Sequence, residues 1–344
     1  MLTDKQRLHI VPAGASVVEA LDALNALSGS TMTLFTVDAD GRLTGSLTDG
    51  DIRRALLGGA SLDSKAGAIC NYACMAVKAG ALEPGLVARA RRKGVELLPV
   101  IDADGVIISL IDLRSRKGLV AADAVLMAGG RGERLRPLTA ETPKPLLPVG
   151  GRAIIDHNVE LLRAYGVENI YVTVNYLKDK IISHFHGSEP EVTCVAEPER
   201  LGTIGSLSLI GTFRSPEVIV MNADLLTDIN LEAMYLKHIE TEADITVAVV
   251  PYSVSVPYAI VEHSGDRVTG LTEKPTYNYF ANAGVYMLRR DVAESVPPRT
   301  YLDATDLIEN TMASGGRVSL FPVSGRWIDI GSPDDYRHAC EIMA

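Results

Sequence analysis

From residue 123 onward, short continuous apolar runs alternate with stretches in which apolar residues recur every three or four positions. Continuous runs of this length are typical of strands buried on both faces, and the second pattern is typical of helices with one buried face. We therefore predict strands at 124–128, 170–174, 192–196 and 218–221, and helices at 154–165, 177–185 and 204–210. This alternation indicates an α/β fold, a Rossmann-like domain whose mostly parallel sheet is covered by helices on both faces.

The first 118 residues carry a different pattern, an internal repeat. The segment Phe35-Thr-Val-Asp-Ala-Asp-Gly41 recurs as Pro99-Val-Ile-Asp-Ala-Asp-Gly105. An Asp-Gly turn between apolar strands is a strong hairpin signal. In each copy we expect a helix, a strand, this turn and a second strand, with helices at 17–27 and 86–93 and second strands at 43–47 and 106–111. Two such units would pack together, so we predict an α+β domain over 1–118, a linker at 114–122 and a second domain over 119–344.

Composition narrows the class of protein. The 344 residues are 47% hydrophobic and 22% charged, as in ordinary globular domains. Residues 1–118 hold 14 Lys and Arg against 13 Asp and Glu, so residues 119–344 hold 19 against 30, and their net charge of −11 argues against nucleic acid as a partner. No apolar run approaches the ~20 residues that span a bilayer, and no signal-like segment opens the chain. We therefore expect a cytoplasmic protein without a membrane partner, its four cysteines being buried thiols.

The predicted strand at 124–128 ends at a basic glycine loop. Three glycines in Gly129–Gly132 let the backbone approach a ligand and turn its N–H groups toward phosphate oxygens. Cationic side chains follow closely, at Arg131, Arg134, Arg136 and Lys144. A lone glycine turn is more often a surface loop, but the preceding strand and the basic residues favour an anion site here.

The sequence Ala128-Gly-Gly-Arg-Gly-Glu-Arg-Leu-Arg-Pro-Leu-Thr139, followed by Pro143-Lys-Pro-Leu-Leu-Pro-Val149, resembles the signature of sugar-1-phosphate nucleotidyltransferases. Glu133 stands where many relatives have Thr or Ser, which weakens the case for a hydroxyl contact there. The resemblance implies catalytic roles for Arg134 and Lys144. It implies nucleotide contacts from the loop itself, namely Met127, Ala128, Gly129, Gly130, Arg131 and Gly132.

Two aspartates are similar to the family's metal-binding elements. Asp224 follows a predicted strand in Asn-Ala-Asp-Leu-Leu, and Asp329 lies in Trp-Ile-Asp-Ile-Gly-Ser-Pro. The resemblance implies that both bind Mg²⁺, a cation that takes a few carboxylates together with phosphate oxygens and water.

A further segment, Glu197-Pro-Glu-Arg-Leu-Gly-Thr203, resembles the base-reading loop and implies nucleotide contacts from Glu197, Gly202 and Thr203. A carboxylate suits guanine, whose Watson–Crick edge offers two adjacent donors. Glu197 facing solvent or binding ribose remains an alternative.

Two later motifs are similar to the family's sugar-phosphate pocket. Thr272-Glu-Lys-Pro275 and Asn282-Ala-Gly-Val-Tyr286 imply that Glu273, Lys274 and Asn282 bind the sugar phosphate. The implied reaction is Mg²⁺-dependent transfer of a nucleotidyl group, GMP from GTP, to a sugar 1-phosphate. A uridylyl- or cytidylyltransferase on the same scaffold, and a non-catalytic nucleotide-sensing subunit, are the alternatives.

The amino-terminal repeat resembles a tandem pair of cystathionine-β-synthase (CBS) domains, most clearly in Val37-Asp-Ala-Asp-Gly-Arg-Leu-Thr-Gly-Ser-Leu-Thr-Asp-Gly-Asp51. In that family the positions of Thr48 and Asp51 contact an adenosine-type nucleotide, which implies a regulatory site. The second copy has Asp112 and Ser115 there, so an equivalent second site is not expected. The alternative is a dimerisation or packing module without a ligand, and we expect a homo-oligomer.

Overall fold

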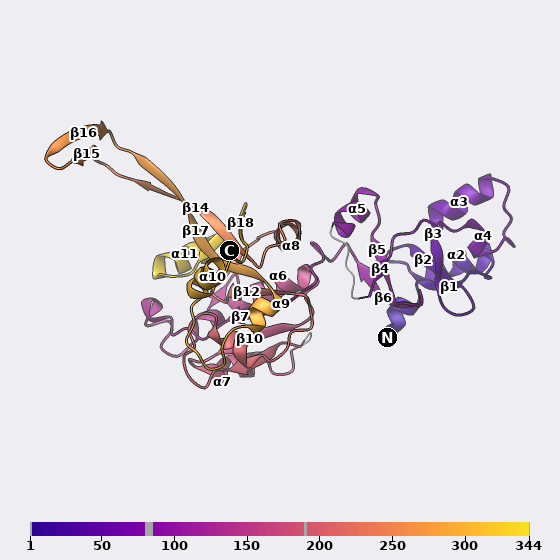
Figure 1. Cartoon of the computed structure of the whole chain (residues 1–344). Coiled ribbons are helices and arrows are strands. Elements are labelled where there is room, and N and C mark those ends of the chain that lie inside the picture. Colours follow the sequence, from indigo (N-terminus) through magenta and orange to yellow (C-terminus); the bar gives the residue numbers. More distant parts are fainter. Residues whose placement is uncertain (1, 80–84, 189–190, 344) are drawn as a thin grey trace. The chain divides into compact units, whose positions relative to one another are not determined.

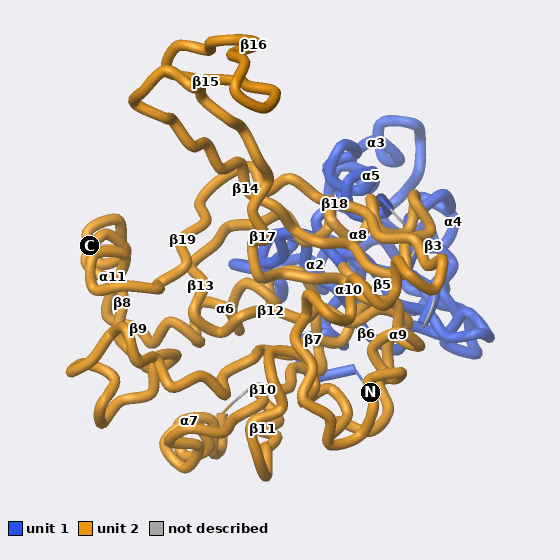
Figure 2. The backbone as a smooth tube through the Cα atoms, turned by 60° about the vertical axis from the view of Figure 1, so that its left-hand side comes forward, with its two compact units in different colours: residues 1–119 blue, residues 120–344 orange. Residues whose placement is uncertain are grey.

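The computed structural model describes residues 2–79, 85–188 and 191–343. They form two compact units, unit 1 (residues 1–119) and unit 2 (residues 120–344) (Figure 2). The predicted linker at 114–122 is too long, because Leu119 and Val120 are buried and a core strand begins at Ala122.

The described part of unit 1 contains two sheets of three strands with the same order and the same directions. In each, the first two strands are parallel and the second and third form an antiparallel hairpin. The strands are β1 (Ile10–Pro12), β2 (Thr33–Val37), β3 (Leu43–Thr48), β4 (Val77–Lys78), β5 (Leu97–Ile101) and β6 (Ile107–Asp112). Both predicted hairpins are confirmed.

The repeat extends to the register and to the turns. Thr33 pairs with Thr48 and Leu97 with Asp112, equivalent positions of the two copies, and the bulge falls at the same place in both hairpins. Asp38 Oδ1 accepts the N–H groups of residues 40 and 42, both at 2.9 Å. Asp102 Oδ1 accepts those of residues 104 and 106, at 3.0 and 2.9 Å. An aspartate that caps its own turn explains why the same four residues close both hairpins.

Helices cover these sheets, and one apolar cluster joins the two halves. The helices are α1 (Asp4–Arg7), α2 (Val17–Ala26), α3 (Asp49–Leu57), α4 (Ala66–Ile69) and α5 (Leu86–Arg92). The joining cluster takes Phe35 and Val37 from the first half and Leu97, Ile107 and Leu110 from the second. Burial of each hairpin against the other is the packing that the repeat predicts.

Unit 2 is built on a seven-stranded sheet among its described residues, with the order β11-β10-β7-β12-β17-β14-β18. All its strands run in one direction except β17, which is antiparallel to both neighbours. The strands are β7 (Ala122–Met127), β10 (Ile170–Val174), β11 (Thr193–Ala196), β12 (Glu217–Asn222), β14 (Ile245–Ser255), β17 (Thr276–Arg289) and β18 (Val318–Pro322). The predicted mostly parallel sheet is confirmed.

Two apolar cores lie on the two faces of this sheet. One core packs under α6 (Ile154–Ala164), α7 (Lys178–Phe185) and α8 (Leu231–Glu240). The other packs under η3 (Gly205–Leu209), α9 (Arg290–Glu294) and α10 (Ala304–Ala313). Residues 204–210 were expected to be an α-helix and instead form the 3-10 helix η3. Thr300 and Leu302 pack closely on Gly205 there. This packing against residues 300–302, rather than the helical spacing of its own apolar residues, sets the conformation of the segment.

Strands β14 and β17 continue past the sheet as a long arm, which ends in the hairpin β15 (Ile260–Ser264) and β16 (Arg267–Thr272). Figure 1 shows the arm projecting from unit 2, with β15 and β16 farthest from the sheet. The arm's pairing is continuous with that of the sheet, from Ile245 opposite Leu288 to Ser255 opposite Thr276, with one irregularity between residues 247 and 249.

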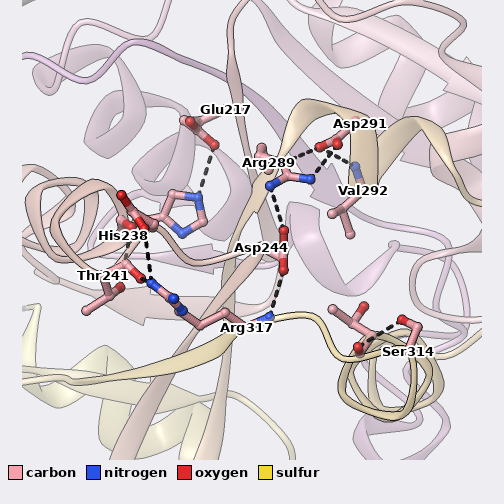
Figure 3. Close-up of polar contacts among 11 residues, drawn as sticks. Glu217, His238, Thr241, Asp244, Arg289, Asp291, Val292, Ser314 and Arg317 are labelled. Carbon is pink, nitrogen blue, oxygen red and sulfur yellow. Dashed lines mark hydrogen bonds and ion pairs between the residues drawn. The ribbon is translucent and has the colours of Figure 1, made fainter.

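The opposite edge of the sheet carries a group of paired polar residues, of which Glu217, His238 and Thr246 are buried and Arg289 and Arg317 are exposed (Figure 3). His238 on α8 lies between Glu217 Oε2, at 3.0 Å, and Thr246 Oγ1, at 2.8 Å. Asp244 Oδ1 forms an ion pair with Arg289 at 2.8 Å, and its Oδ2 accepts the N–H of Arg317 at 2.7 Å. Because these groups satisfy one another, we assign this edge to stability.

Two other expectations bear on the chain as a whole. Cys70 is buried, but Cys74, Cys194 and Cys340 are only partly buried, and all four are free thiols. No helix in the described residues combines the length and apolar character that crossing a bilayer requires.

Candidate functional site

The glycine loop leaves β7 at the carboxyl edge of the sheet. Met127 pairs with Asn222 of β12, and the Ala223 N–H donates to the Met127 carbonyl at 3.2 Å. On the other side, the Ala128 N–H donates to the Thr173 carbonyl of β10 at 2.9 Å. The loop therefore begins between two neighbouring strand ends, which is where ligands bind in open α/β sheets.

A small sheet brings the two predicted metal-binding aspartates together. Strand β13 (Leu225–Thr227) follows Asp224 and pairs antiparallel with β19 (Trp327–Asp329), so that Leu225 lies opposite Asp329. The Ile330 N–H also donates to the Asp224 carbonyl at 3.2 Å. Two carboxylates more than a hundred residues apart thus meet beside the glycine loop.

Lys144 lies between these aspartates. Its Nζ donates to Asp224 Oδ2 in an ion pair and lies 3.9 Å from Asp329 Oδ1, and its side chain is only 11% exposed. Lys144 opens the 3-10 helix η2 (Lys144–Leu146). An apolar cluster packs the segment around η2 against β13 and β19, and it consists of Leu135, Leu147, Val149, Ile154, Leu226, Ile330 and Ala339.

The electrostatics around Asp224 and Asp329 favour the binding of a cation. Burial and the negative charge of Asp224 raise the pKa of Asp329, while Lys144 and Arg134 oppose the rise. Asp224 Oδ1 is buried without a hydrogen-bond partner. An orphaned carboxylate oxygen is costly unless a cation or donor meets it, so these residues fit a metal ion. The described residues hold no group of three His, Cys, Asp or Glu side chains placed to bind a metal ion.

Glu197 follows β11 and is 5% exposed beneath the glycine loop. A Cβ on Gly129 would stand 2.8 Å from Glu197 Oε1 and 3.5 Å from the Cβ of Asn175, so a larger residue there would displace the Glu197 carboxylate. The Leu201 N–H, 3.4 Å from Oε2, is a long hydrogen bond. Burial raises the pKa of Glu197.

The rest of the glycine loop divides into a packed and an open part. Gly132 has φ +58°, and a Cβ there would lie 3.0 Å from Thr139 and 3.1 Å from Lys144 Cβ. Gly130 has open space where a Cβ would be. Arg131 is exposed and faces Glu133 at 3.8 Å. Gly132 thus fixes the turn toward Lys144, and Gly130 and Arg131 are accessible to a ligand.

Gly202 and Thr203 lie against a different element, the start of α10. Gly202 packs on the Leu302 carbonyl with φ +81°. The Thr203 N–H donates to Asp303 Oδ1 at 3.0 Å, and the Thr203 hydroxyl accepts the Ala304 N–H at 2.8 Å. These contacts show that Gly202 and Thr203 anchor the loop at 197–203 to the start of α10.

The predicted sugar-phosphate residues do not lie together. Asn282, at the base of the arm, donates to the Tyr286 hydroxyl at 2.9 Å, and nearby Gly284 packs against Asn222, two residues before Asp224. Glu273 and Lys274 lie on the arm with side chains 72% and 69% exposed, and their charged atoms are 3.9 Å apart. Asn282 is therefore near the aspartates, whereas Glu273 and Lys274 are not brought to them.

In unit 1, Thr48 and Asp51 form the capping box of α3. Thr48 Oγ1 donates to Asp51 Oδ2 at 2.7 Å, and the Asp51 N–H donates to Thr48 Oγ1 at 3.3 Å. Both also line a cavity of about 550 Å³, which Lys93 and Glu96 of the second half border as well. The pair has a clear structural role and also faces a space of ligand size.

Sequence reasoning assigned no role to three residues near the site. Asn175 packs against the glycine loop, and Asn222 packs against Gly284. Asp335 raises the pKa of Asp329 by its charge and lies in the first turn of α11 (Pro333–Ile342), where it accepts from the N-cap residue Ser332 through Ser332 Oγ at 2.7 Å. A strand-terminal asparagine and an aspartate in the first turn of a helix are ordinary local signals, so the residue types alone give these positions no role.

Comparison with known proteins gives the context of this geometry. Residues 123–344 match the model of the nucleotidyl transferase family. Mannose-1-phosphate guanyltransferase of Aspergillus fumigatus is 33% identical over 229 residues, and mannose-1-phosphate guanylyltransferase 1 of Arabidopsis thaliana is 31% identical over 226 residues. Each alignment covers 62% of this chain, which spans about 62% of the length of these relatives.

Among solved structures, HddC from Yersinia pseudotuberculosis complexed with GMP-PN is 25% identical, with a TM-score of 0.51. The likeness covers 65% of this chain and 100% of that one, and it confirms the predicted fold of unit 2. The family match includes the glycine loop, Lys144 and both aspartates. Through unit 2, the chain belongs to the nucleotidyl transferase family.

Proposed function

We propose that this chain transfers a nucleotidyl group, GMP from GTP, to a sugar 1-phosphate, which gives a nucleotide sugar and pyrophosphate. The observation that carries the proposal is the ion pair of Lys144 with Asp224, beside Asp329 and the glycine loop. It puts one cation and two carboxylates where the loop's N–H groups would hold phosphates. The names of relatives that are guanylyltransferases support the reaction class.

Mg²⁺ is the cofactor that the donor set supports. Asp224 Oδ1 lacks a hydrogen-bond partner, and Asp329 is a second carboxylate, whose pKa is raised by burial and by the charge of Asp224. Mg²⁺ is commonly bound by one or two carboxylates plus substrate phosphates and water. When bound, it would neutralise phosphate charge and orient the reacting groups.

The protein's own residues would act mainly by placing charge. An oxygen of the sugar phosphate attacks the α-phosphorus of GTP, the bond from that phosphorus to the bridging oxygen breaks, and pyrophosphate leaves with the electron pair. The attacking phosphate is already ionised, so no general base is needed. Lys144 and Arg134 stabilise the negative charge that develops on the triphosphate and the leaving group.

Base choice is assigned to Glu197. Its carboxylate is buried under Gly129, at the loop that would hold the nucleotide. An ionised carboxylate accepts from both donors on the guanine edge, but it meets an acceptor on adenine or cytosine. For the sugar phosphate we assign Asn282 near the aspartates and Glu273 and Lys274 on the arm.

The experiment is pyrophosphate release with Mg²⁺, with each of four nucleoside triphosphates tested against a panel of sugar 1-phosphates. Turnover with GTP supports the proposal and names the sugar. Preference for UTP or CTP would keep the reaction but make the protein a uridylyl- or cytidylyltransferase. Silence across the panel from folded protein would favour a non-catalytic nucleotide-sensing subunit.

For unit 1 we propose a regulatory site for an adenosine-type nucleotide in the cavity lined by Thr48 and Asp51. Calorimetric titration with AMP, ADP and ATP tests it, with GTP as the comparison. Binding that Asp51→Ala weakens tenfold or more, while Asp49→Ala at an exposed position of the same helix does not, is expected. No binding would leave unit 1 as a packing or dimerisation module.

A further inference from the structure

The arm formed by residues 251–282 is an amphipathic hairpin with one apolar face exposed. Tyr252 pairs with Tyr279 and Val254 pairs with Tyr277, and directly paired residues of an antiparallel hairpin share a face. All four residues are exposed: Tyr252 by 59%, Tyr279 by 55%, Val254 by 40% and Tyr277 by 41%.

The opposite face is polar and satisfied from residue 253 outward, whereas nearer the sheet it carries Pro251 paired with Phe280, which is 60% exposed. Ser253 donates to Asn278 Oδ1 at 2.7 Å, and the hydroxyls of Ser255 and Thr276 are 3.0 Å apart. A hairpin of two strands is marginally stable in water unless one face packs against something. Along residues 252–255 and 276–279 tyrosine and valine lie on one side only, which marks that side as the face that packs.

The arm cannot cover this face by folding onto its own site without losing its pairing. Its ladder continues without a break from Val249 opposite Asn282 to Ser255 opposite Thr276. Six residues of extended strand at ~3.3 Å each place Thr276 roughly 20 Å from Asn282. Lys274 lies beyond Thr276, so in this structure it is farther from Asp224 than a lysine side chain reaches.

The same arm begins at the edge of the sheet that carries the site. Strand β14 runs parallel to β18 and antiparallel to β17, and β17 is antiparallel to β12, so β14 leaves the sheet at the carboxyl edge, as β7 and β12 do. Both views show the arm extending outward from there (Figures 1 and 2). The arm starts beside the site of its own chain and holds Glu273 and Lys274 away from that site. Such an arm is suited to reach the same site on another copy of the chain.

We propose that the arm packs on a second copy of this chain and delivers Glu273 and Lys274 to that copy's aspartates, so that each sugar-phosphate pocket is completed in trans. This inference rests on the proposed function, which assigns those two residues to the pocket. A second copy is the occupant because every copy offers the site that these residues fit. A two-fold pair is the simplest closed arrangement for such an exchange.

The apolar area available agrees with this occupant. Three tyrosines and one valine, each about half exposed, offer on the order of 400 Å² per copy. Leu271 and Val261 at the tip, paired with each other and 67% and 49% exposed, add to it. A standard interface buries about 800 Å² per partner, so the arm supplies roughly half, and the surface that receives it supplies the rest.

The test uses two full-length variants that are each inactive in a different part. Asp224→Asn keeps the arm and loses the metal ligand; Lys274→Ala keeps the metal ligand and loses the arm's cation. Heterodimers isolated by two different affinity tags contain one intact site of two, so they should recover about half of the wild-type rate. Activity no higher than that of the two parents would overturn the inference, as would full activity of Lys274→Ala by itself.

Mass in solution is the second measurement and needs no turnover. Wild-type protein should be a dimer by light scattering, and Tyr252→Ser/Tyr279→Ser should be monomeric with an unchanged circular dichroism spectrum. Asn278→Ser, on the polar face, is the matched control and should stay dimeric. If the wild type transfers nothing but the tyrosine variant still changes mass, the proposed function fails and the docking of the arm stands. If the double tyrosine variant has the same mass as the wild type, the docking is wrong.

Discussion

Replacing Lys144 by alanine should slow turnover and tighten metal binding, two effects of opposite sign. Lys144 Nζ pairs with Asp224 and lies 3.9 Å from Asp329, so its loss leaves two carboxylates facing each other. If Lys144 stabilises the charge that develops on the triphosphate, its removal should lower kcat by about 10²–10³, as for other positioned donors in active sites.

The same ammonium competes with a metal ion for the aspartates. A unit charge 4 Å from a carboxylate is worth about 1 kcal/mol in water and about 4 kcal/mol near a protein surface. The Asp329 side chain is 43% exposed, so a value near the lower figure applies to that pair. An energy of about 1.4 kcal/mol corresponds to a tenfold gain in affinity for Mg²⁺ in the absence of substrate.

The assay pairs pyrophosphate release with calorimetric titration of Mg²⁺ into the substrate-free protein. Lys237→Ala, at an exposed position on α8, is the control and should change neither quantity. A thermal melt checks that the variant is folded. Near-normal kcat would show that Lys144 is misassigned, and metal binding that weakens along with kcat would refute the competition argued here.

Three further substitutions probe the surroundings of the site. Gly129→Ala would place a Cβ 2.8 Å from Glu197 Oε1, so we expect KM for GTP to rise about tenfold or more with little change in melting temperature, measured by initial rates. Glu197→Gln should abolish the preference for GTP and raise stability at pH 7 by about 1 kcal/mol, because burial raises the pKa of this carboxyl and makes its ionisation costly. That gain should vanish below the ordinary pKa of 4.5, where both states are protonated, and unfolding at pH 4 and 7 tests the sign. Asp123→Ala removes a fully buried carboxylate that accepts from Asn169 and Ser215, and should cost about 3 kcal/mol, or roughly 6–12 °C in melting temperature.

Local sequence patterns were enough for most elements near the site. The strand at 170–174 is observed with the predicted bounds. Helix α6 ends one residue before its predicted end, and β7 begins two residues and ends one residue before its predicted bounds. The two strands have continuous apolar runs, and the helix has apolar residues every three or four positions before Gly166. In these three elements local preference and tertiary burial therefore agree. The segment 204–210 shows the opposite case, since its helical period gave way to packing against residues 300–302.

The candidate site was predictable only as a set of residues. The sequence contains Lys144, Asp224 and Asp329, but their meeting depends on the pairing of β13 with β19, a contact between distant segments. Burial of Glu197 under Gly129 likewise depends on the parallel pairing of β10 with its two neighbours. A local hydrophobic period does not record which strands pair or in what register, which is why sequence patterns assign no role to Asn175 and Asp335.

The arm shows a different limit of reading one chain alone. Residues 252–254 and 277–279 alternate polar and apolar in the manner of a half-buried hairpin, yet this chain leaves the apolar side exposed. In natural sequences local pattern and global burial normally agree, so a conflict confined to one segment indicates a missing neighbour rather than a poor pattern. The conflict disappears if a second copy covers the tyrosines. The same assumption accounts for the exposure of Glu273 and Lys274, so one contact explains both the packing and the chemistry of the arm.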